Sequence, residues 1–198
     1  MALVSATTKV QIISKAFLLL GEPNPVLDLD ATPTTSAASQ LYDLLVQELL
    51  TSHIWRFALF TVELNQTTSD PENDYWQNQF QLPANYLTMV NLYKDGQRDP
   101  WIDYQIFGDK IWTNQTAPLY CVYLYDPGPA NYPAYYIQLL VYKLAALIAM
   151  NITQNDQLAT LYTELSEKYM TQAVNRDEMA MPSLYIKYNP FFNAHYGL

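Results

Sequence analysis

The sequence predicts a mainly helical α+β fold: a four-helix bundle core, interrupted by a small antiparallel β-sheet or open barrel and followed by an extended C-terminal tail. Apolar residues recur at helical spacing near both ends of the chain. Short β-branched and aromatic runs, separated by turn residues, fill the middle. The expected boundaries are 1–58 and 131–180 for the helical bundle, 59–130 for the β insertion and 181–198 for the tail.

The first two helices are expected before residue 53. One runs from about Thr8 to Leu20, where apolar side chains recur every three or four residues. The other is expected to begin at Thr35 or Ser36 and to reach about Ser52, with an apolar stripe made of Ala37, Leu41, Leu44, Leu45 and Leu49. A fairly long loop with three prolines joins them, which favours an antiparallel pair.

Strands are expected in the middle of the chain, over 59–64, 87–93, 101–107, 110–113 and 119–125. Asp95-Gly96 and Gly108-Asp109 have the composition of hairpin turns. Residues 65–78 are polar and rich in turn formers, so a loop is expected there. Together these runs predict a small antiparallel sheet or open barrel.

Two more helices are expected after the strands, from about Pro133 to Met150 and from about Asp156 to Asp177. Pro133 suits a first helical turn, and Asn155 is a natural N-cap for the last helix. The apolar positions of the last helix are Leu158, Leu161, Leu165, Tyr169 and Ala173.

The tail, residues 181–198, shows no helical period and is expected to be extended. It holds five aromatic residues: Tyr185, Tyr188, Phe191, Phe192 and Tyr196. An exposed tail this aromatic would promote aggregation, so it is expected to dock. Its own domain and a partner protein are both open as the docking surface.

The charge balance argues against a protein that grips nucleic acid. The chain has 10 Lys and Arg against 19 Asp and Glu, a net charge of −9. Phosphate binding needs clustered basic residues, and none are clustered here. An acidic channel wall that repels phosphate and lets a duplex slide past is compatible with this composition.

Composition also bears on partners and compartment. Tyrosine occurs 17 times and tryptophan 4 times, against 5 glycines, and such aromatic enrichment is typical of protein interfaces. No run of about 18 consecutive apolar residues is present, so a membrane-spanning helix is not expected. The N-terminus lacks a signal-peptide pattern, and a soluble protein made in a reducing cytosol is predicted.

No catalytic, cofactor-binding or metal-binding residues are predicted, and the chain is not expected to be an enzyme. Cys121 lies in an apolar run and reads as a buried, inert thiol. His53 is expected to pack or cap at the end of the second helix, and His195 has no ligand neighbours. The carboxylates at Asp28 and Asp30, and those between 70 and 74, lack the glycine and closing glutamate of a calcium loop.

Several short motifs follow one another in a recognisable order: Ile13-x-x-Ala16-x-x-x-Leu20-Gly21-Glu22-Pro23, His53-Ile-Trp55-x-Phe57-Ala58, Phe80-x-Leu82-Pro83-Ala-x-Tyr86-Leu87, Ile111-Trp112-Thr113, Leu119-Tyr-Cys-Val-Tyr123 and Tyr136-Ile-x-Leu139-Leu140. In this order, over about residues 9 to 175, the chain resembles the head-to-tail adaptor of short-tailed bacteriophages, the tail tubular protein A family. The total length is also similar. The tail after Met181 has no pattern that matches this family.

The resemblance implies a structural protein of the virion tail, made in the host cytoplasm and placed at the head–tail junction. It implies a dodecameric ring beneath the portal protein, with the tail nozzle protein below, tail fibres possible at the β unit, and DNA passing through the lumen. The portal-binding residues would be Tyr185, Tyr188, Phe191, Phe192 and Tyr196. Trp101, Tyr104 and Trp112 would be candidates for nozzle binding, with packing inside the small sheet as their alternative role.

Two other functions stay open at this stage. One is a cytosolic scaffold or chaperone-like binding module that forms a small oligomer and has no affinity for a portal ring. The other is an enzyme with an unrecognised site built from Asp28, Asp30 and a histidine, which would require a pocket where these residues converge.

Overall fold

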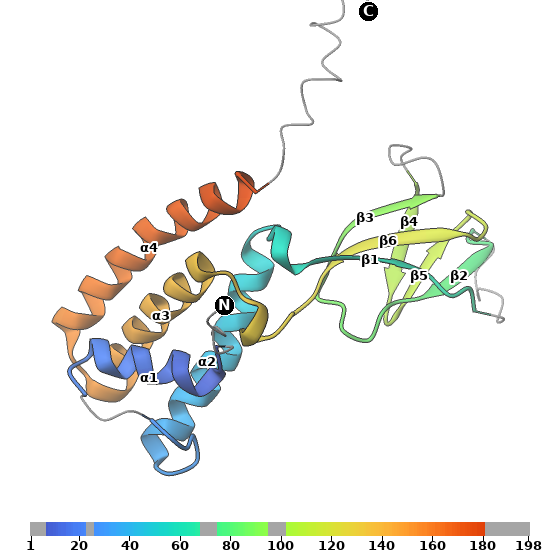
Figure 1. Cartoon of the computed structure of the whole chain (residues 1–198). Helices are drawn as coiled ribbons and strands as arrows, with labels where there is room; N and C mark the ends of the chain where they lie inside the picture. The colour runs from blue at the N-terminus through green and yellow to red at the C-terminus, as the bar shows by residue number, and fades with distance from the viewer. Residues whose placement is uncertain (1–6, 23–25, 68–74, 95–101, 181–198) are drawn as a thin grey trace, which may run out of the picture.

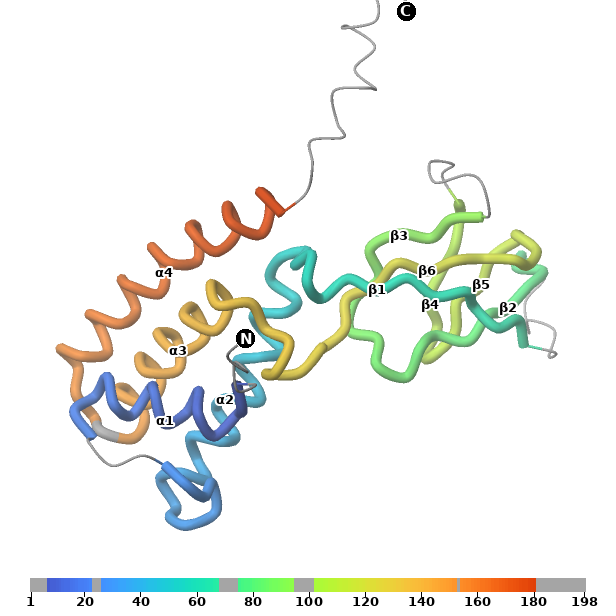
Figure 2. Tube along the Cα trace, viewed as in Figure 1, coloured from blue at the N-terminus to red at the C-terminus, as the bar shows by residue number. Residues whose placement is uncertain are grey.

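The fold combines four α-helices with two three-stranded antiparallel sheets in the part of the chain that a computed structural model describes, residues 7–22, 26–67, 75–94 and 102–180. The helices gather at one end of the molecule and the strands at the other (Figure 1). The chain enters the strand region after the second helix and returns before the third (Figure 2). This arrangement confirms the expected α-and-β class and the order of the elements.

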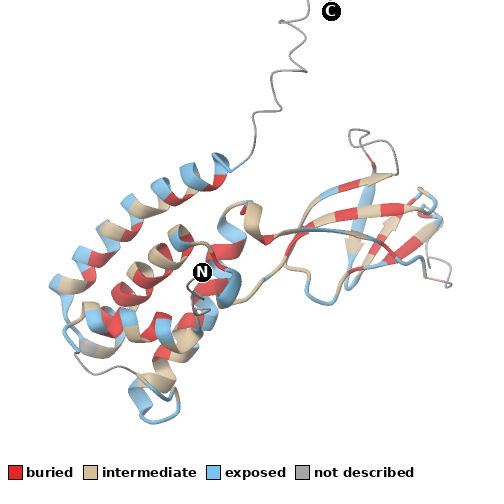
Figure 3. Ribbon diagram, viewed as in Figure 1, coloured by how far each residue is buried: buried red, intermediate tan, exposed pale blue. Residues whose placement is uncertain are grey.

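The helical unit is organised around one central helix. Its helices are α1 (Lys9–Leu19), α2 (Pro33–Ser52), α3 (Ala134–Ile148) and α4 (Asp156–Glu178). Helix α3 packs against each of the other three, and its Leu139, Leu140 and Leu144 are fully buried. A π-helical turn, η3 (Ala149–Thr153), extends α3 towards α4. Figure 3 shows the buried residues along the sides of the helices that face one another.

Side-chain caps fix where the helices begin. Thr8 and Gln11 form a reciprocal capping box at α1, and the side chain of Asn155 accepts the Leu158 N–H at α4, as expected for an N-cap. Helix α2 begins at Pro33, two or three residues before the predicted start at Thr35 or Ser36. Thr32 caps it in a reciprocal pair with Thr35, and Pro33 takes the first helical position, which suits proline because no hydrogen bond is lost there.

The buried faces of α2 and α4 differ from the predicted apolar stripes. Leu44 is 67% exposed and Leu161 is 47% exposed, although both were assigned to the core. Tyrosines take part of the space instead: the rings of Tyr42 and Tyr162 are buried. The prediction counted aliphatic side chains and gave too little weight to tyrosine, whose ring packs like phenylalanine and whose hydroxyl can bond a polar group. Tyr162, for example, donates to the Leu19 carbonyl at 2.7 Å.

The β unit consists of two sheets rather than one. The first has the order β1–β6–β3, with β1 (Leu59–Glu63), β6 (Leu119–Leu124) and β3 (Thr88–Lys94). The second has the order β2–β5–β4, with β2 (Asn78–Gln81), β5 (Lys110–Thr113) and β4 (Tyr104–Phe107). Strand β2 was missed because three of its four residues are polar and only Phe80 is a large apolar residue.

One core lies between the two sheets. Residues from both contribute to it, among them Leu64, Phe80, Leu92, Ile111 and Cys121. The chain crosses from one sheet to the other just after β1, where the Leu64 N–H donates to the Leu119 carbonyl and the Gln81 N–H donates to the Asn65 carbonyl. The Gly108-Asp109 hairpin joins β4 to β5 as predicted. Asp95-Gly96 lies outside the described residues.

One helical segment is apolar enough to be compared with a membrane span. Ala134–Ile152 meets the length and composition of a spanning helix, although no membrane-spanning helix was expected from the sequence. Half of this window is buried within the fold. Because α3 contacts the three other helices, its position as the central core helix accounts for its apolar character.

Candidate functional site

Only two of the eight predicted partner-binding residues lie in the described part of the chain. They are Tyr104 on β4 and Trp112 on β5. The others are outside the described residues: Trp101, Tyr185, Tyr188, Phe191, Phe192 and Tyr196.

The structure does not bring Tyr104 and Trp112 together. Tyr104 lies opposite Thr113, whereas Trp112 lies opposite Gln105, so their side chains project from opposite faces of the second sheet. Tyr104 is on the face that packs onto the β core, and it is 37% exposed. Burial raises the pKa of its phenol, with smaller contributions from Tyr86 and Cys121. Packing is therefore part of the role of Tyr104.

Trp112 lies on the outer face of the second sheet, where it forms an exposed aromatic pair. Its ring meets Phe107 edge-on, with 5.0 Å between ring centroids. Phe107 is 43% exposed, and Trp112 is half-buried. The Trp112 indole N–H is buried without a hydrogen-bond partner in the described part of the chain. Sequence reasoning missed Phe107; the signal was its place beside a hairpin turn, where a large apolar residue has little core to enter.

The helical and β units meet at a cluster of aromatic rings, the junction cluster: Trp55, Phe57, Tyr132, Tyr135 and Tyr136. Trp55 and Tyr136 are fully buried and meet edge-on at 5.3 Å, and the Trp55 indole N–H donates to the Leu49 carbonyl. Phe57 contacts the four other rings. Leu59, Leu87, Val90 and Leu124 of the β unit pack into the same hydrophobic core as these rings.

A buried carboxylate, Asp177, fastens the end of α4 to this junction. Its side chain is fully buried, and it accepts the Arg56 backbone N–H at 2.9 Å and the Tyr135 hydroxyl at 2.7 Å. Burial and this hydrogen bond raise the pKa of Tyr135 well above its ordinary value, so the phenol remains a donor. His53 stacks edge-on against Trp55, with Nε2 3.7 Å from Asp177 Oδ2, which confirms the expected packed histidine.

A second carboxylate, Asp126, sits where β6 leaves for α3. It accepts the Tyr132 hydroxyl at 2.6 Å and the Gly128 N–H at 2.8 Å. Burial and the hydrogen bond to Asp126 raise the pKa of Tyr132 far above its ordinary value. Asp177 thus joins α4 to the turn after α2 and to α3, and Asp126 holds the turn between β6 and α3.

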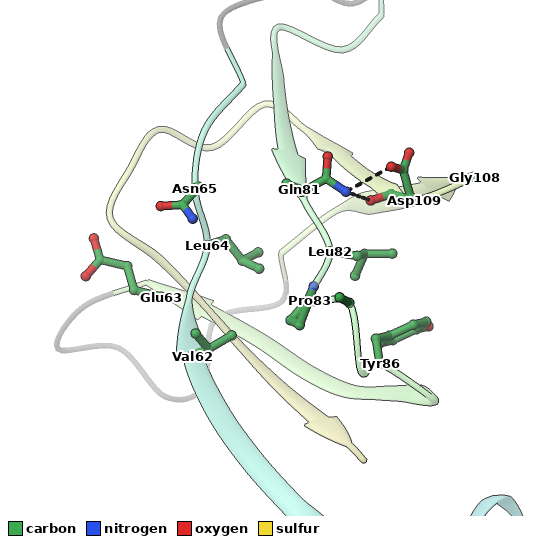
Figure 4. A pocket seen from close by; sticks show the side chains of 11 residues that line it. Val62, Glu63, Leu64, Asn65, Gln81, Leu82, Pro83, Tyr86, Gly108 and Asp109 are labelled. Carbon is green, nitrogen blue, oxygen red and sulfur yellow. Dashed lines mark hydrogen bonds between the residues drawn. The ribbon is translucent and has the colours of Figure 1, made fainter. Parts of the chain in front are cut away.

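A cavity of about 660 Å³ opens at the far end of the β unit (Figure 4). Residues 62–65, which end β1 and continue it, line one side, and residues 81–84 with Tyr86 line the other. Gln81 reaches Asp109 at the rim, donating to its carboxylate at 2.9 Å. The lining mixes aliphatic side chains with this polar rim, and such a lining suits an apolar or aromatic side chain with a polar edge.

The residues considered as possible nucleophiles or metal ligands do not come together in one site. Burial raises the pKa of the Cys121 thiol to about 12, so the sulfur stays protonated and unreactive at neutral pH. Asp28 and Asp30 lie in an exposed turn, closed by the Asp30 N–H to the Asp28 carboxylate, and do not line the cavity beside β1. Within the described ranges, no group of three His, Cys, Asp or Glu could hold a metal ion.

Comparisons with known proteins add no relative. No known protein-family model matches this sequence, and no curated protein is recognisably similar to it.

Proposed function

We propose that this chain is a structural subunit of a phage virion, a head-to-tail adaptor that forms a ring between the portal protein and the tail nozzle. The motif order along residues 9–175 resembles that family, and the two-ended architecture supports the same role. An adaptor must present one surface to each of two partner rings, and here a helical unit and a β unit lie at opposite ends (Figure 1).

The observation that carries the proposal is the fixed junction between these two units. Two chain passages, residues 55–59 and 124–134, connect them. The junction cluster lies where these passages meet the helices, and Leu59 and Leu124 of the β unit pack into the same core. A rigid angle between two binding ends matters in a ring, because a contact repeated by a constant rotation closes only when the subunit has one shape.

Each unit then has a task in the ring. The helices, arranged as a four-helix bundle, form the wall, and the acidic balance of the chain gives a lumen to which DNA does not adhere. The β unit, as a small open barrel, faces the nozzle and can seat tail fibres. Its outer sheet face offers Phe107 and Trp112 as the contact, whereas Tyr104 lies on the other face. Trp101 stays a candidate for nozzle binding. The tail residues Tyr185, Tyr188, Phe191, Phe192 and Tyr196 form the portal anchor.

The experiment is the mass of the purified chain by light scattering, alone and after mixing with a portal dodecamer. The adaptor gives a monomer alone and a ring-sized increase in mass on the portal. A stable small oligomer that does not bind the portal would contradict the adaptor proposal and would favour the cytosolic scaffold or chaperone-like module.

A matched pair of variants separates the two ends of the subunit. Trp112→Ala on the outer sheet face should leave portal uptake unchanged and lower nozzle binding on the assembled ring, because an aromatic anchor at an interface costs 2 kcal/mol or more, roughly thirtyfold in affinity, when truncated. Tyr93→Ala, which removes a ring stacked on Tyr120 in the other sheet, is the control. Equal effects of the two substitutions on nozzle binding would contradict the proposal that Trp112 binds the nozzle.

A further inference from the structure

The edge of strand β1 is open in the described part of the chain. In the first sheet, β1 pairs only with β6, over Leu59–Glu63. The Tyr125 N–H to Ala58 carbonyl and Leu64 N–H to Leu119 carbonyl bonds bracket this ladder. Because hydrogen-bonded pairs alternate along an antiparallel ladder, the backbone groups of Thr61 and Glu63 point away from β6, to the free edge.

This edge carries fewer protective devices than the other edge of the sheet, and its one charged residue is Glu63. The other edge of the same sheet, β3, carries a bulge between Met89 and Asn91 and ends in Lys94, and both features discourage pairing. Strand β1 is regular, contains no proline or lysine and exposes half of Phe60. A weakly protected strand edge with apolar side chains is a place where another strand adds.

The chain itself contains a segment with the pattern of such a strand. Residues 183–189, Ser-Leu-Tyr-Ile-Lys-Tyr-Asn, lie between Pro182 and Pro190. Leu184, Ile186 and Tyr188 alternate with Tyr185 and Lys187, which is strand periodicity, with one mostly apolar set and one set that carries the charge. The prolines limit the strand to this length, which covers the five residues of β1.

The end of α4 brings this segment to the start of β1. Asp177 is bonded to Arg56, three residues before β1 begins, and the described chain continues to Ala180. Residues 181 and 182 link Ala180 to Ser183, and these three Cα–Cα steps can span roughly 10 Å. Strand β1 leads away from the helices (Figure 1), so a segment arriving from α4 runs parallel to it.

We propose that residues 183–189 add to the free edge of β1 of the same subunit as a fourth, parallel strand of the first sheet. In the register that places Lys187 beside Glu63, Tyr185 lies beside Thr61, on the exposed polar side of β1. Leu184, Ile186 and Tyr188 then fall on the side of Phe60 and Val62, which continues the β core. Side-chain type and charge thus match on both faces of the added strand.

The same placement accounts for the cavity beside β1. The cavity is lined by residues 62–65, at the end of β1 farthest from the helices (Figure 4). A strand parallel to β1 delivers its next residues, Pro190, Phe191 and Phe192, to this opening. Aromatic rings suit a cavity whose walls include Leu64, Leu82 and Pro83.

This docking does not depend on the proposed function, but it has a consequence for it. Tyr185, Tyr188 and the two phenylalanines are the proposed portal anchor. Held on β1, they are unavailable to neighbouring subunits, and the portal must displace the strand to bind them. The docked tail would thus keep the free subunit from joining rings before the portal is present.

The test is a disulfide scan of the full chain at low concentration, without any partner. Thr61→Cys with Tyr185→Cys places both thiols on one face, whereas Thr61→Cys with Ile186→Cys places them on opposite faces, because one residue of shift reverses the side. The first pair should close an intramolecular disulfide roughly tenfold faster than the second. The natural Cys121 is buried and leaves the readout clean.

Equal rates for the two pairs would overturn the proposal, and so would cross-links that form only between chains, since the occupant would then be a second copy. A charge exchange tests the register independently. Lys187→Glu should speed hydrogen exchange at the Thr61 and Glu63 amides by roughly two- to fivefold, and adding Glu63→Lys should restore it. Unchanged exchange in both variants would also overturn it, whatever the outcome with the portal.

Discussion

At the scale of single residues, Asp177 shows how one side chain can define a junction. A fully buried carboxylate is costly unless its oxygens are satisfied, and here a backbone N–H and a tyrosine hydroxyl satisfy them, with His53 nearby. Both donors come from other elements, the turn after α2 and the start of α3. The carboxylate therefore joins three segments that are distant in sequence, and the end of α4 takes its position from it.

Replacing Asp177 by alanine should lower the free energy of unfolding by about 3 kcal/mol, because the Arg56 N–H and the Tyr135 hydroxyl would lose their acceptor inside the fold. Tyr135→Phe, which removes one of the two bonds, should cost about 1 kcal/mol. Urea unfolding monitored by circular dichroism measures both. Glu178→Ala, at the exposed neighbouring position, is the control and should change the midpoint little. Equal midpoints for the Asp177 and Glu178 variants would show that the hydrogen bonds of the buried carboxylate do not stabilise the fold.

At the scale of elements, the local sequence determines where most helices and strands begin and end, and tertiary packing determines which of their faces are buried. Helix α4 begins at Asp156, directly after its N-cap Asn155, and the two-residue turn at Gly108-Asp109 joins β4 and β5 as its composition predicts. Gly108 has φ +59, in the left-handed region where a side chain is strained.

Gly108→Ala should destabilise the hairpin by about 1 kcal/mol through backbone strain alone, because a Cβ there would meet no other atom within 4 Å. Gly108→Asn is the matched control, and it should be tolerated better because asparagine enters the left-handed region more readily. Thermal unfolding of the three proteins gives the comparison. A larger loss with asparagine than with alanine would indicate a steric cause instead of strain.

Strand β2 and the buried faces of the helices show where sequence reasoning stops. Asn78–Gln81 has no strand pattern of its own; it is a strand because β5 lies beside it and Phe80 fills the core. The exposure of Leu44 likewise depends on where α3 passes, which periodicity within α2 does not contain. Tyr104 and Trp112 were grouped by residue type, and only the register of β4 on β5 shows that they face opposite ways.

At the scale of the whole molecule, the helical core and the β core are connected at the junction cluster. The helical core includes Ala58 and Leu124, from the two ends of the strand region, and the β core lies between the sheets. Between them the junction cluster spans the two chain passages. Its members were visible in the sequence only as scattered aromatic residues in residues 55–57 and 132–136, because nothing local indicates that these stretches meet.

Phe57 is the member whose removal should separate the two units. It is half-buried and touches Trp55, Tyr132, Tyr135 and Tyr136, so Phe57→Ala should cost about 2 kcal/mol. The amides of β6 should then open at lower denaturant concentration than the amides of α3, whereas in the unaltered protein we expect both sets to open together. Hydrogen exchange in increasing urea measures both sets. Phe107→Ala, at the far end of the β unit, is the control, since its ring contacts Trp112 and lies away from the junction cluster. If Phe57→Ala lowered the opening free energy of α3 and β6 equally, the junction cluster would be part of a single cooperative core. The fixed angle between the two units, on which ring closure depends, would then have to come from the packing of the two cores themselves.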